Sequence, residues 1–129
     1  MGTNKSAKIK GVVMAQNKKI EINLFVVLFE DSGSHVAYCP ALNIYGYGNS
    51  EIEAKDSFEV CLKEFFEYTI NKKTLLAELK SLGWNVKREK KFKAPNFSDL
   101  LASNKELRKI MDTKDFRKIS EPFVIPAFS

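Results

Sequence analysis

The sequence predicts an α+β fold: an antiparallel β-sheet of about three to five strands packed against one long and one short helix, with a helical and extended C-terminal extension. Two patterns predict this fold class. Apolar residues alternate along residues 20–30 and return in short runs up to residue 47, which is typical of strands. From residue 51 they recur every three or four positions, which is typical of a helix that lies on a sheet.

Length and composition favour one domain with a small appendage. The 129 residues are 44% hydrophobic, so the chain can bury a core without disulfides or a metal. We expect the two cysteines, Cys39 and Cys61, to be small buried hydrophobic residues. There is no apolar run of the roughly 20 residues that a membrane span needs, and residues 1–10 lack the apolar core of a signal peptide. We therefore expect a cytoplasmic protein with no membrane attachment.

The first part of the chain predicts a meandering antiparallel sheet. Residues 20–30 alternate, and their last part is apolar on both sides, as in an interior strand. Residues 31–34 predict a tight turn, with returning strands at 35–39 and 44–47. Residues 7–15 are apolar and weakly alternating, and are long enough for an additional strand.

A long helix is predicted over residues 51–70. Ser50 followed by Glu53 is a capping box, in which the hydroxyl accepts a helix amide and the carboxylate reaches back to the cap amide. The helix glutamates mostly face water, which makes this outer face the most acidic part of the chain. A second helix, over residues 74–82, ends at Gly83. The apolar side of the long helix comprises Ala54, Phe58, Cys61, Leu62, Phe65, Phe66 and Thr69.

The last third of the chain predicts one more strand and then an extension. Residues 84–92 alternate like a strand. Pro95 disfavours helix in the residue before it, so we divide the chain into a domain over residues 1–92 and an extension over residues 93–129. Residues 97–111 of the extension predict helix, either as one piece or as two short turns.

The helical segment of the extension has two candidate N-caps and one interruption. Asn96 and Ser98 both precede its apolar residues and suit the cap position. Ser103 and Asn104 interrupt its middle.

Residues 120–129 predict an extended arm. They contain two prolines and the alternating apolar residues Phe123, Ile125 and Phe128, so the arm is too apolar for solvent and too proline-rich for a central strand. Such an arm suits addition to a sheet edge, in its own sheet or in a neighbouring subunit's. We expect a homodimer or a higher homo-oligomer, because closed two-fold pairing is the commonest arrangement of soluble oligomers.

Few residues could do catalytic chemistry. His35 is the only histidine, so no histidine cluster can hold a metal. Asp31, Ser32 and Ser34 lie near it in sequence, but all four share one turn, whereas a catalytic triad assembles residues from separate rigid elements. Glycine-rich phosphate loops are absent.

The carboxylates that could work in pairs are Glu30, Asp31, Glu51 and Glu53. Turn and cap roles explain all four. We therefore expect no enzyme activity, no cofactor and no metal. A hydrolase that uses Glu30, Asp31 and Glu51 with a divalent ion is the residual alternative.

A series of short motifs runs through residues 25–54. In order, these are Phe25-Val-Val-Leu-Phe-Glu30, a turn at Gly33, Val36-Ala-Tyr-Cys-Pro-Ala-Leu42, Gly48-Asn-Ser50 and Glu53-Ala54. This order resembles the HicB antitoxin family, in which a strand ends in an acidic turn and is followed by a Y-V-A-x-x-P-x-L strand, a G-D/N-S/T turn and an E-A helix start. The match covers residues 23–70 and extends towards residue 92.

The resemblance implies a partial ribonuclease-H-like fold that has lost nuclease chemistry. Family members neutralise a small basic RNA-cleaving toxin, HicA, and often repress their own operon through an added DNA-binding segment. In this chain, residues 93–129 show neither a helix-turn-helix nor a ribbon-helix-helix pattern. Residues 42–46 replace the family's usual short turn.

We therefore expect a non-enzymatic, antitoxin-like protein that binds and inhibits a HicA-like toxin. Acidic side chains would speed the encounter with a basic partner, and aromatic anchors would hold the complex. Core packing explains the candidate tyrosines equally well. The candidate contact residues are Glu30, Asp31, Tyr45, Tyr47, Glu59 and Glu67.

The alternative is a nucleic-acid-binding regulatory module, with operator DNA as a partner. The net charge is +5, and residues 83–129 carry eleven Lys or Arg against six Asp or Glu. Their densest cluster contains Lys87, Arg88, Lys90 and Lys91. Such a cluster could meet phosphates, or it could be a solvated strand edge that lysines protect from pairing.

Overall fold

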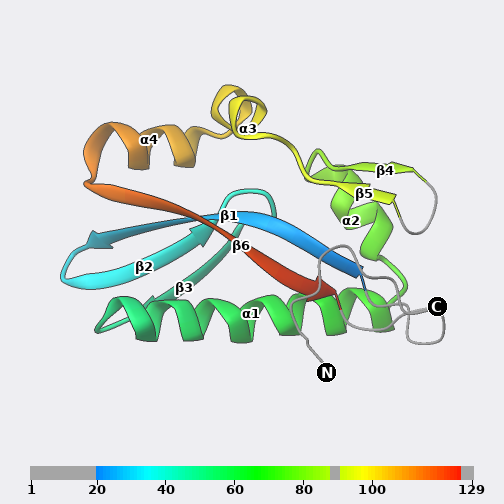
Figure 1. The fold of residues 1–129 in the computed structure, drawn as a ribbon, viewed down its shortest axis with the longest axis horizontal. Helices are drawn as coiled ribbons and strands as arrows, with labels where there is room; N and C mark the ends of the chain where they lie inside the picture. The colour runs from blue at the N-terminus through cyan, green and yellow to red at the C-terminus, as the bar shows by residue number, and fades with distance from the viewer. Residues whose placement is uncertain (1–19, 88–90, 126–129) are drawn as a thin grey trace.

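The computed structural model describes residues 20–87 and 91–125 and has the predicted α+β fold (Figure 1). Four antiparallel strands form the main sheet in the order β3-β2-β1-β6, and β4 and β5 form a separate ribbon. Helix α1 covers one face of the main sheet, and α3 and α4 cover the other. In chain order, the elements are β1 (Ile20–Asp31), β2 (Ser34–Cys39), β3 (Ile44–Gly48), α1 (Glu51–Asn71), α2 (Leu75–Ser81), β4 (Asn85–Lys87), β5 (Lys91–Lys93), α3 (Phe97–Ser103), α4 (Lys105–Thr113) and β6 (Phe116–Ile125).

Strand β1 is an interior strand with both faces covered. Leu24 and Val26 are buried on one face and Val27 on the other, as the two-sided apolar pattern predicts. The predicted turn after β1 is confirmed. It consists of Ser32 (φ 54°) and Gly33 (φ 84°), and two successive positive φ values suit the right-handed twist of a two-residue hairpin.

Helix α1 lies directly against β3 because Gly46 has no side chain. A Cβ at Gly46 would lie 2.2 Å from the backbone nitrogen of Phe58 and 2.4 Å from the carbonyl oxygen of Ala54. The predicted apolar side of the helix is confirmed, with Cys61 and Phe65 half-buried at its border. The fully buried residues of α1 are Ala54, Phe58, Leu62, Phe66 and Thr69.

The predicted capping box at the start of α1 forms, with one change of partner. The Ser50 hydroxyl accepts a hydrogen bond from the Glu53 amide at 3.1 Å, as expected. The Glu53 carboxylate instead accepts from the amide of Asn49, at 2.9 Å. The reciprocal contact therefore falls one residue before the cap residue.

The single strand predicted over residues 84–92 is wrong. Strands β4 and β5 pair with each other, and β6 occupies the place beside β1 in the main sheet. Trp84 is buried just before β4, and its Nε1 donates to the carbonyl of Ala41 at 2.8 Å. This bond ties the start of the ribbon to the loop between β2 and β3.

The helical part of the extension forms two helices, as the interruption in the sequence indicates. Asn96, not Ser98, caps α3, because its Oδ1 accepts from the amide of Asp99 at 2.8 Å. Asn104 separates the helices and caps α4 through the amide of Leu107, at 2.9 Å. Among the described residues, no helix combines the length and the apolar character needed to cross a membrane.

The predicted arm is a strand of the molecule's own sheet. It begins at Phe116, four residues earlier than predicted, and β6 pairs with β1 over ten register positions as far as Ile20 opposite Ile125. Phe123 packs edge-on against Phe58 of α1, with ring centroids 5.6 Å apart. The apolar segment at residues 7–15, which is long enough for an additional strand, and the arm residue Phe128 lie outside the described residues.

Candidate functional site

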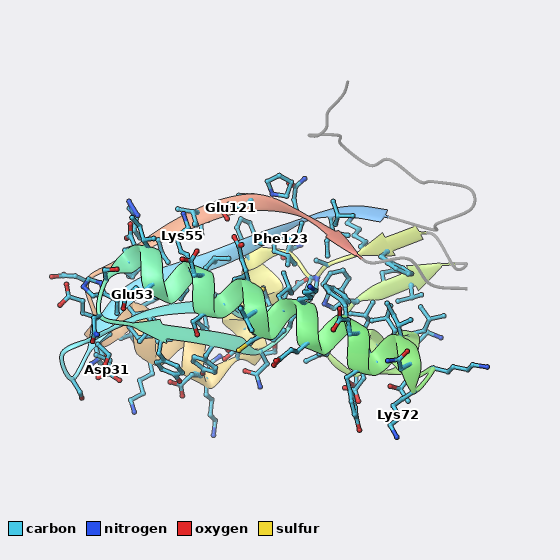
Figure 2. All side chains as sticks on the ribbon, turned by 90° about the horizontal axis from the view of Figure 1, so that it is seen from below. Asp31, Glu53, Lys55, Lys72, Glu121 and Phe123 are labelled. Carbon is cyan, nitrogen blue, oxygen red and sulfur yellow. The ribbon has the colours of Figure 1, made fainter. Side chains whose placement is uncertain are left out.

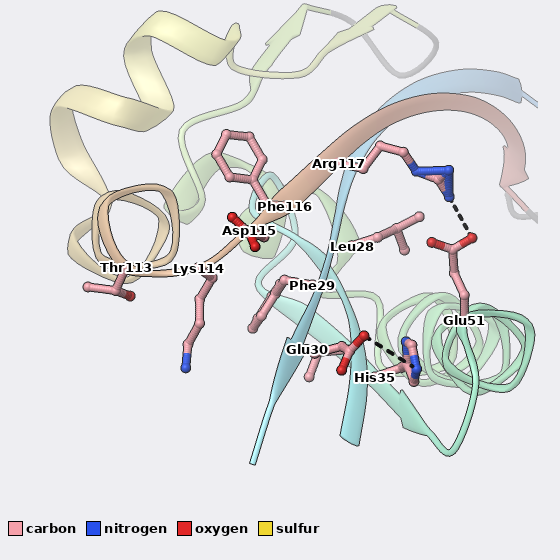
Figure 3. A pocket seen from close by; sticks show the side chains of 11 residues that line it. Leu28, Phe29, Glu30, His35, Glu51, Thr113, Lys114, Asp115, Phe116 and Arg117 are labelled. Carbon is pink, nitrogen blue, oxygen red and sulfur yellow. Dashed lines mark hydrogen bonds and ion pairs between the residues drawn. The ribbon is translucent and has the colours of Figure 1, made fainter. Parts of the chain in front are cut away.

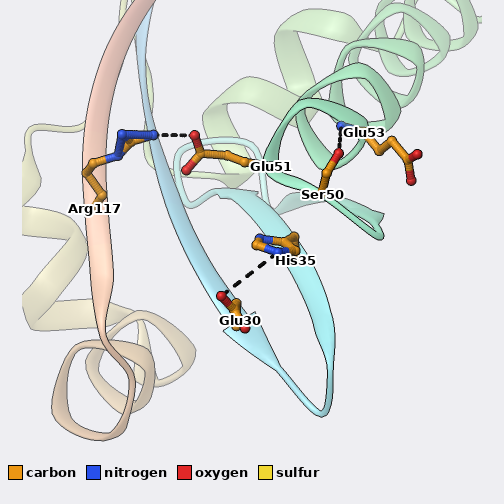
Figure 4. A network of polar contacts seen from close by, with 6 residues as sticks. All are labelled: Glu30, His35, Ser50, Glu51, Glu53 and Arg117. Carbon is orange, nitrogen blue, oxygen red and sulfur yellow. Dashed lines mark hydrogen bonds and ion pairs between the residues drawn. The ribbon is translucent and has the colours of Figure 1, made fainter.

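The three carboxylates of the hydrolase alternative each contact a His, Lys or Arg side chain, and Figures 3 and 4 show the contacts of Glu30 and Glu51. A cavity of about 470 Å³ opens between the ends of β1 and β2, the start of α1 and residues 113–117. Two of the carboxylates line it. The pairs are Glu30 with His35 at 3.9 Å, Asp31 with Lys114 at 2.9 Å, and Glu51 with Arg117.

These pairings leave no cluster of carboxylates for a metal ion. Lys114 lowers the pKa of Asp31, first through its hydrogen bond and then through its charge. The Ser32 hydroxyl donates to Asp31 at 3.4 Å, while His35 contacts Glu30. Within residues 20–87 and 91–125, no three His, Cys, Asp or Glu side chains are grouped so that they could hold a metal ion.

The two candidate tyrosines project from the sheet face opposite α1. Successive side chains of a strand alternate, and Gly46 of β3 contacts α1, so its neighbours Tyr45 and Tyr47 face α4. There they line a cavity of about 300 Å³ together with α4 residues. Tyr45 stacks on the buried Tyr38 with ring centroids 4.3 Å apart, and Tyr47 is 58% exposed at the end of the stack.

Burial explains most of the tyrosine stack. Desolvation raises the pKa of Tyr38 and of Tyr45, so both phenols stay protonated at neutral pH. The Tyr38 hydroxyl donates to Asn43 at 3.2 Å and accepts from Asn104 at 2.9 Å. Core packing therefore accounts for Tyr38 and Tyr45, and only Tyr47 offers much of its ring to a partner.

The exposed side of α1 is acidic and also carries apolar side chains; Figure 2 shows the helix, with Glu53 labelled near its start. Five carboxylates on it face solvent, against one exposed lysine. Three apolar side chains are also unusually exposed: Ile52 at 72%, Val60 at 57% and Tyr68 at 64%. We call this set the α1 outer face; it consists of Ile52, Glu53, Asp56, Glu59, Val60, Lys63, Glu64, Glu67 and Tyr68.

The structure therefore divides the predicted contact residues among three places. Glu59 and Glu67 lie on the α1 outer face, Glu30 and Asp31 lie at the β1–β2 turn, and the tyrosines lie on the opposite face of the sheet. The exposed apolar residues of α1 were missed. The signal for them was present, because Ile52, Val60 and Tyr68 are apolar yet fall outside the i, i+3, i+4 stripe.

The basic cluster lies at the β4–β5 ribbon. In the backbone register of the ribbon, Lys87 pairs with Lys91 and Asn85 pairs with Lys93. Two further residues of the cluster, Arg88 and Lys90, lie outside the described residues.

Comparisons with protein-family models, with curated proteins and with solved structures found no match to this chain.

Proposed function

We propose that this protein is a non-enzymatic, antitoxin-like protein that binds and inhibits a small basic RNA-cleaving toxin of the HicA kind. One observation carries the proposal: the α1 outer face presents five exposed carboxylates together with three exposed apolar side chains. Single exposed apolar side chains are common on protein surfaces, so the support comes from the position of these three among the carboxylates of one helix face. The resemblance to HicB antitoxins supports the same conclusion.

Charge and apolar contact have separate roles in this proposal. The carboxylates attract a basic partner and raise the association rate. Ile52, Val60 and Tyr68 then supply the apolar burial that slows dissociation. Inhibition follows from occlusion, in which the bound surface covers the toxin's RNA-cleaving site, so no catalytic group on this protein is required.

The test needs the small basic protein encoded beside this gene. The double variant Glu59→Lys/Glu67→Lys should associate with it about tenfold more slowly at low salt, and added salt should reduce the difference. The matched control is Glu78→Lys/Glu106→Lys, which reverses two exposed carboxylates on α2 and α4. Association rates and inhibition of RNA cleavage are the two measurements.

Two results would contradict this proposal. One is equal loss of association in the α1 variant and in the control, because the α1 outer face would then have no special role. The other is the absence of any toxin-sized neighbouring gene together with a pull-down from the native host that recovers no small basic protein.

A second candidate function is nucleic-acid binding by the ribbon. It is favoured by the four Lys or Arg residues within 87–91 and by the two-stranded ribbon on which this cluster falls, because such a ribbon fits the major groove. About five phosphate contacts would give a log–log salt slope of about −4.5 on duplex DNA. Binding that is absent at low salt would exclude this function. So would binding that is unchanged when Lys87, Arg88, Lys90 and Lys91 are replaced by Glu.

A further inference from the structure

A groove runs between α1 and β6, beside the α1 outer face. Its volume is about 670 Å³, which is in the range of pockets that hold small ligands or single large side chains. Its floor is apolar, because Leu62 and Phe66 are buried and Phe123 is half-buried. The lining residues are Glu59, Leu62, Lys63, Phe66, Glu121, Pro122, Phe123 and Val124.

The contacts between α1 and β6 define where the groove begins. Lys55 of α1 and Glu121 of β6 form an ion pair at 3.2 Å, and Figure 2 shows Phe123 further along the strand from this pair. Val124 also borders the groove, but strand alternation turns its side chain away from α1, because Glu121 and Phe123 face the helix. The groove thus has an ion pair at one end and the half-buried Phe123 along β6.

The charges around the groove indicate what it can hold. Glu121 is neutralised by Lys55. On the helix side, Glu59 and Lys63 both line the groove and both belong to the α1 outer face. That face carries five exposed carboxylates against this one lysine, so the apolar floor adjoins a surface that is negative overall. A bound segment would bury an apolar side chain on the floor and place basic neighbours over the carboxylates.

We propose that this groove is the anchor site for one large apolar side chain of an extended, basic segment of a partner protein. The inference rests on the proposed function, because it identifies the anchor within the same acidic surface. Burying an aromatic or aliphatic side chain in such a pocket is the usual source of binding energy at interfaces, while the carboxylates set the preference for a basic segment.

Two acetylated and amidated peptides provide the probe. The first has the sequence Lys-Gly-Lys-Phe-Lys-Gly-Lys, and the second has Gly in place of Phe. In NMR titrations at low salt, the first peptide should shift the methyl signals of Leu62, and the second should not. The phenylalanine peptide should also bind about tenfold more tightly, as expected for burial of one aromatic side chain.

A matched pair of variants locates the site. Phe123→Ala removes the half-buried aromatic ring from the groove floor, and Leu76→Ala truncates an exposed apolar side chain of α2 outside the groove. Phe123→Ala keeps strand β6 and Leu76 is exposed, so both variants should fold. Phe123→Ala should reduce the advantage of the phenylalanine peptide, and Leu76→Ala should retain it. Inhibition of the toxin should follow the same order.

Three results would overturn the groove proposal. Equal binding of the two peptides, or equal effects of the two variants, would mean that the carboxylates alone bind; the proposed function would then stand without the groove. Phenylalanine-dependent binding that appears only after deletion of residues 1–19 would make this chain's own segment the occupant. A different combination of results would support the groove but count against the proposed function. In that case the phenylalanine peptide binds in the groove, but the native host encodes no toxin.

Discussion

At the scale of single residues, Gly46 allows the close contact between β3 and α1, and this contact could not be predicted from the sequence. The capping roles of Ser50 and Asn96 could be predicted, because a cap depends on residues three positions apart in the chain. The close approach of α1 to Gly46 could not, because it depends on which strand lies under the helix. The exposure of Tyr47 was equally hidden, since period-two spacing gives two faces without saying what covers each.

Replacing Gly46 with alanine should destabilise the protein by about 3 kcal/mol, because the new methyl overlaps backbone atoms of α1 and overpacking of this kind costs up to about that amount. Gly33→Ala is the control. It has free space around it but a φ of 84°, so it should cost only about 1 kcal/mol. Chemical denaturation measures both. Equal losses would mean that α1 shifts easily away from β3.

Asn104 links the start of α4 to the core through both polar atoms of its side-chain amide: Oδ1 accepts from the Leu107 amide, and Nδ2 donates to the Tyr38 hydroxyl. Asn104→Ala should lose the cap and a partly buried hydrogen bond, about 2 kcal/mol in all. Asn104→Asp keeps a cap oxygen and should lose less. In the background of Tyr38→Phe the effect of Asn104→Ala should fall by about 1 kcal/mol. Full additivity in this double-mutant cycle would show that the two side chains do not interact.

At the scale of elements, the sequence predicts which helices and strands form better than it predicts which strands pair with each other. The strands up to residue 48, the first two helices and the helical segment that forms α3 and α4 were predicted because periodicity is local. The ribbon and the position of β6 were not, because pairing joins residues such as Ile20 and Ile125 that are far apart in sequence. The arm's two prolines indicated an edge strand, and β6 is at an edge, but nothing local selected β1 as its neighbour.

The ion pair of Asp31 with Lys114 joins the β1–β2 turn to the end of α4, and it should make stability depend on pH. The folded pKa of Asp31 is lowered below its ordinary value of 3.8. The pair therefore stabilises the fold at pH values above the unfolded pKa, and this contribution disappears as the pH falls through the folded pKa. An NMR titration should show a depressed pKa that returns towards 3.8 in Lys114→Met. The same pKa in both proteins would mean that the pair does not form in solution.

The carboxylates at the end of β1 and at the start of α1 should not cleave RNA. Glu30, Asp31 and Glu51 contact His35, Lys114 and Arg117 respectively, so binding a divalent ion would require breaking those contacts. RNA-cleavage assays with magnesium and manganese should therefore give no product with the wild type or with Asp31→Ala. Metal-dependent cleavage by the wild type that is lost in the variant would restore the hydrolase alternative.

At the scale of the whole molecule, the last described strand completes the sheet that the first begins. Strand β6 continues directly from α4, which covers one face of the sheet, and then runs beside β1 to contact α1 on the other face (Figure 1). The ion pairs of Glu51 with Arg117 and of Lys55 with Glu121 follow this path. The extension is thus part of the core architecture. The homodimer expected from the arm remains a prediction, and its interface must use other surfaces if β6 stays in its own sheet.

Removing β6 tests that arrangement. A chain that ends at residue 115 would leave β1 without its partner over ten register positions and would uncover the apolar surface that Phe123 covers on Phe58. Because interior strands need both neighbours to satisfy their backbone groups, we expect this chain to lose cooperative unfolding and to aggregate. Phe123→Ala, which keeps the strand, should unfold cooperatively with a loss of about 2 kcal/mol. Circular dichroism and light scattering distinguish the alternatives. If the truncated chain is instead a folded monomer and the full chain a dimer, β6 is exchanged between subunits and does not belong to its own sheet in solution.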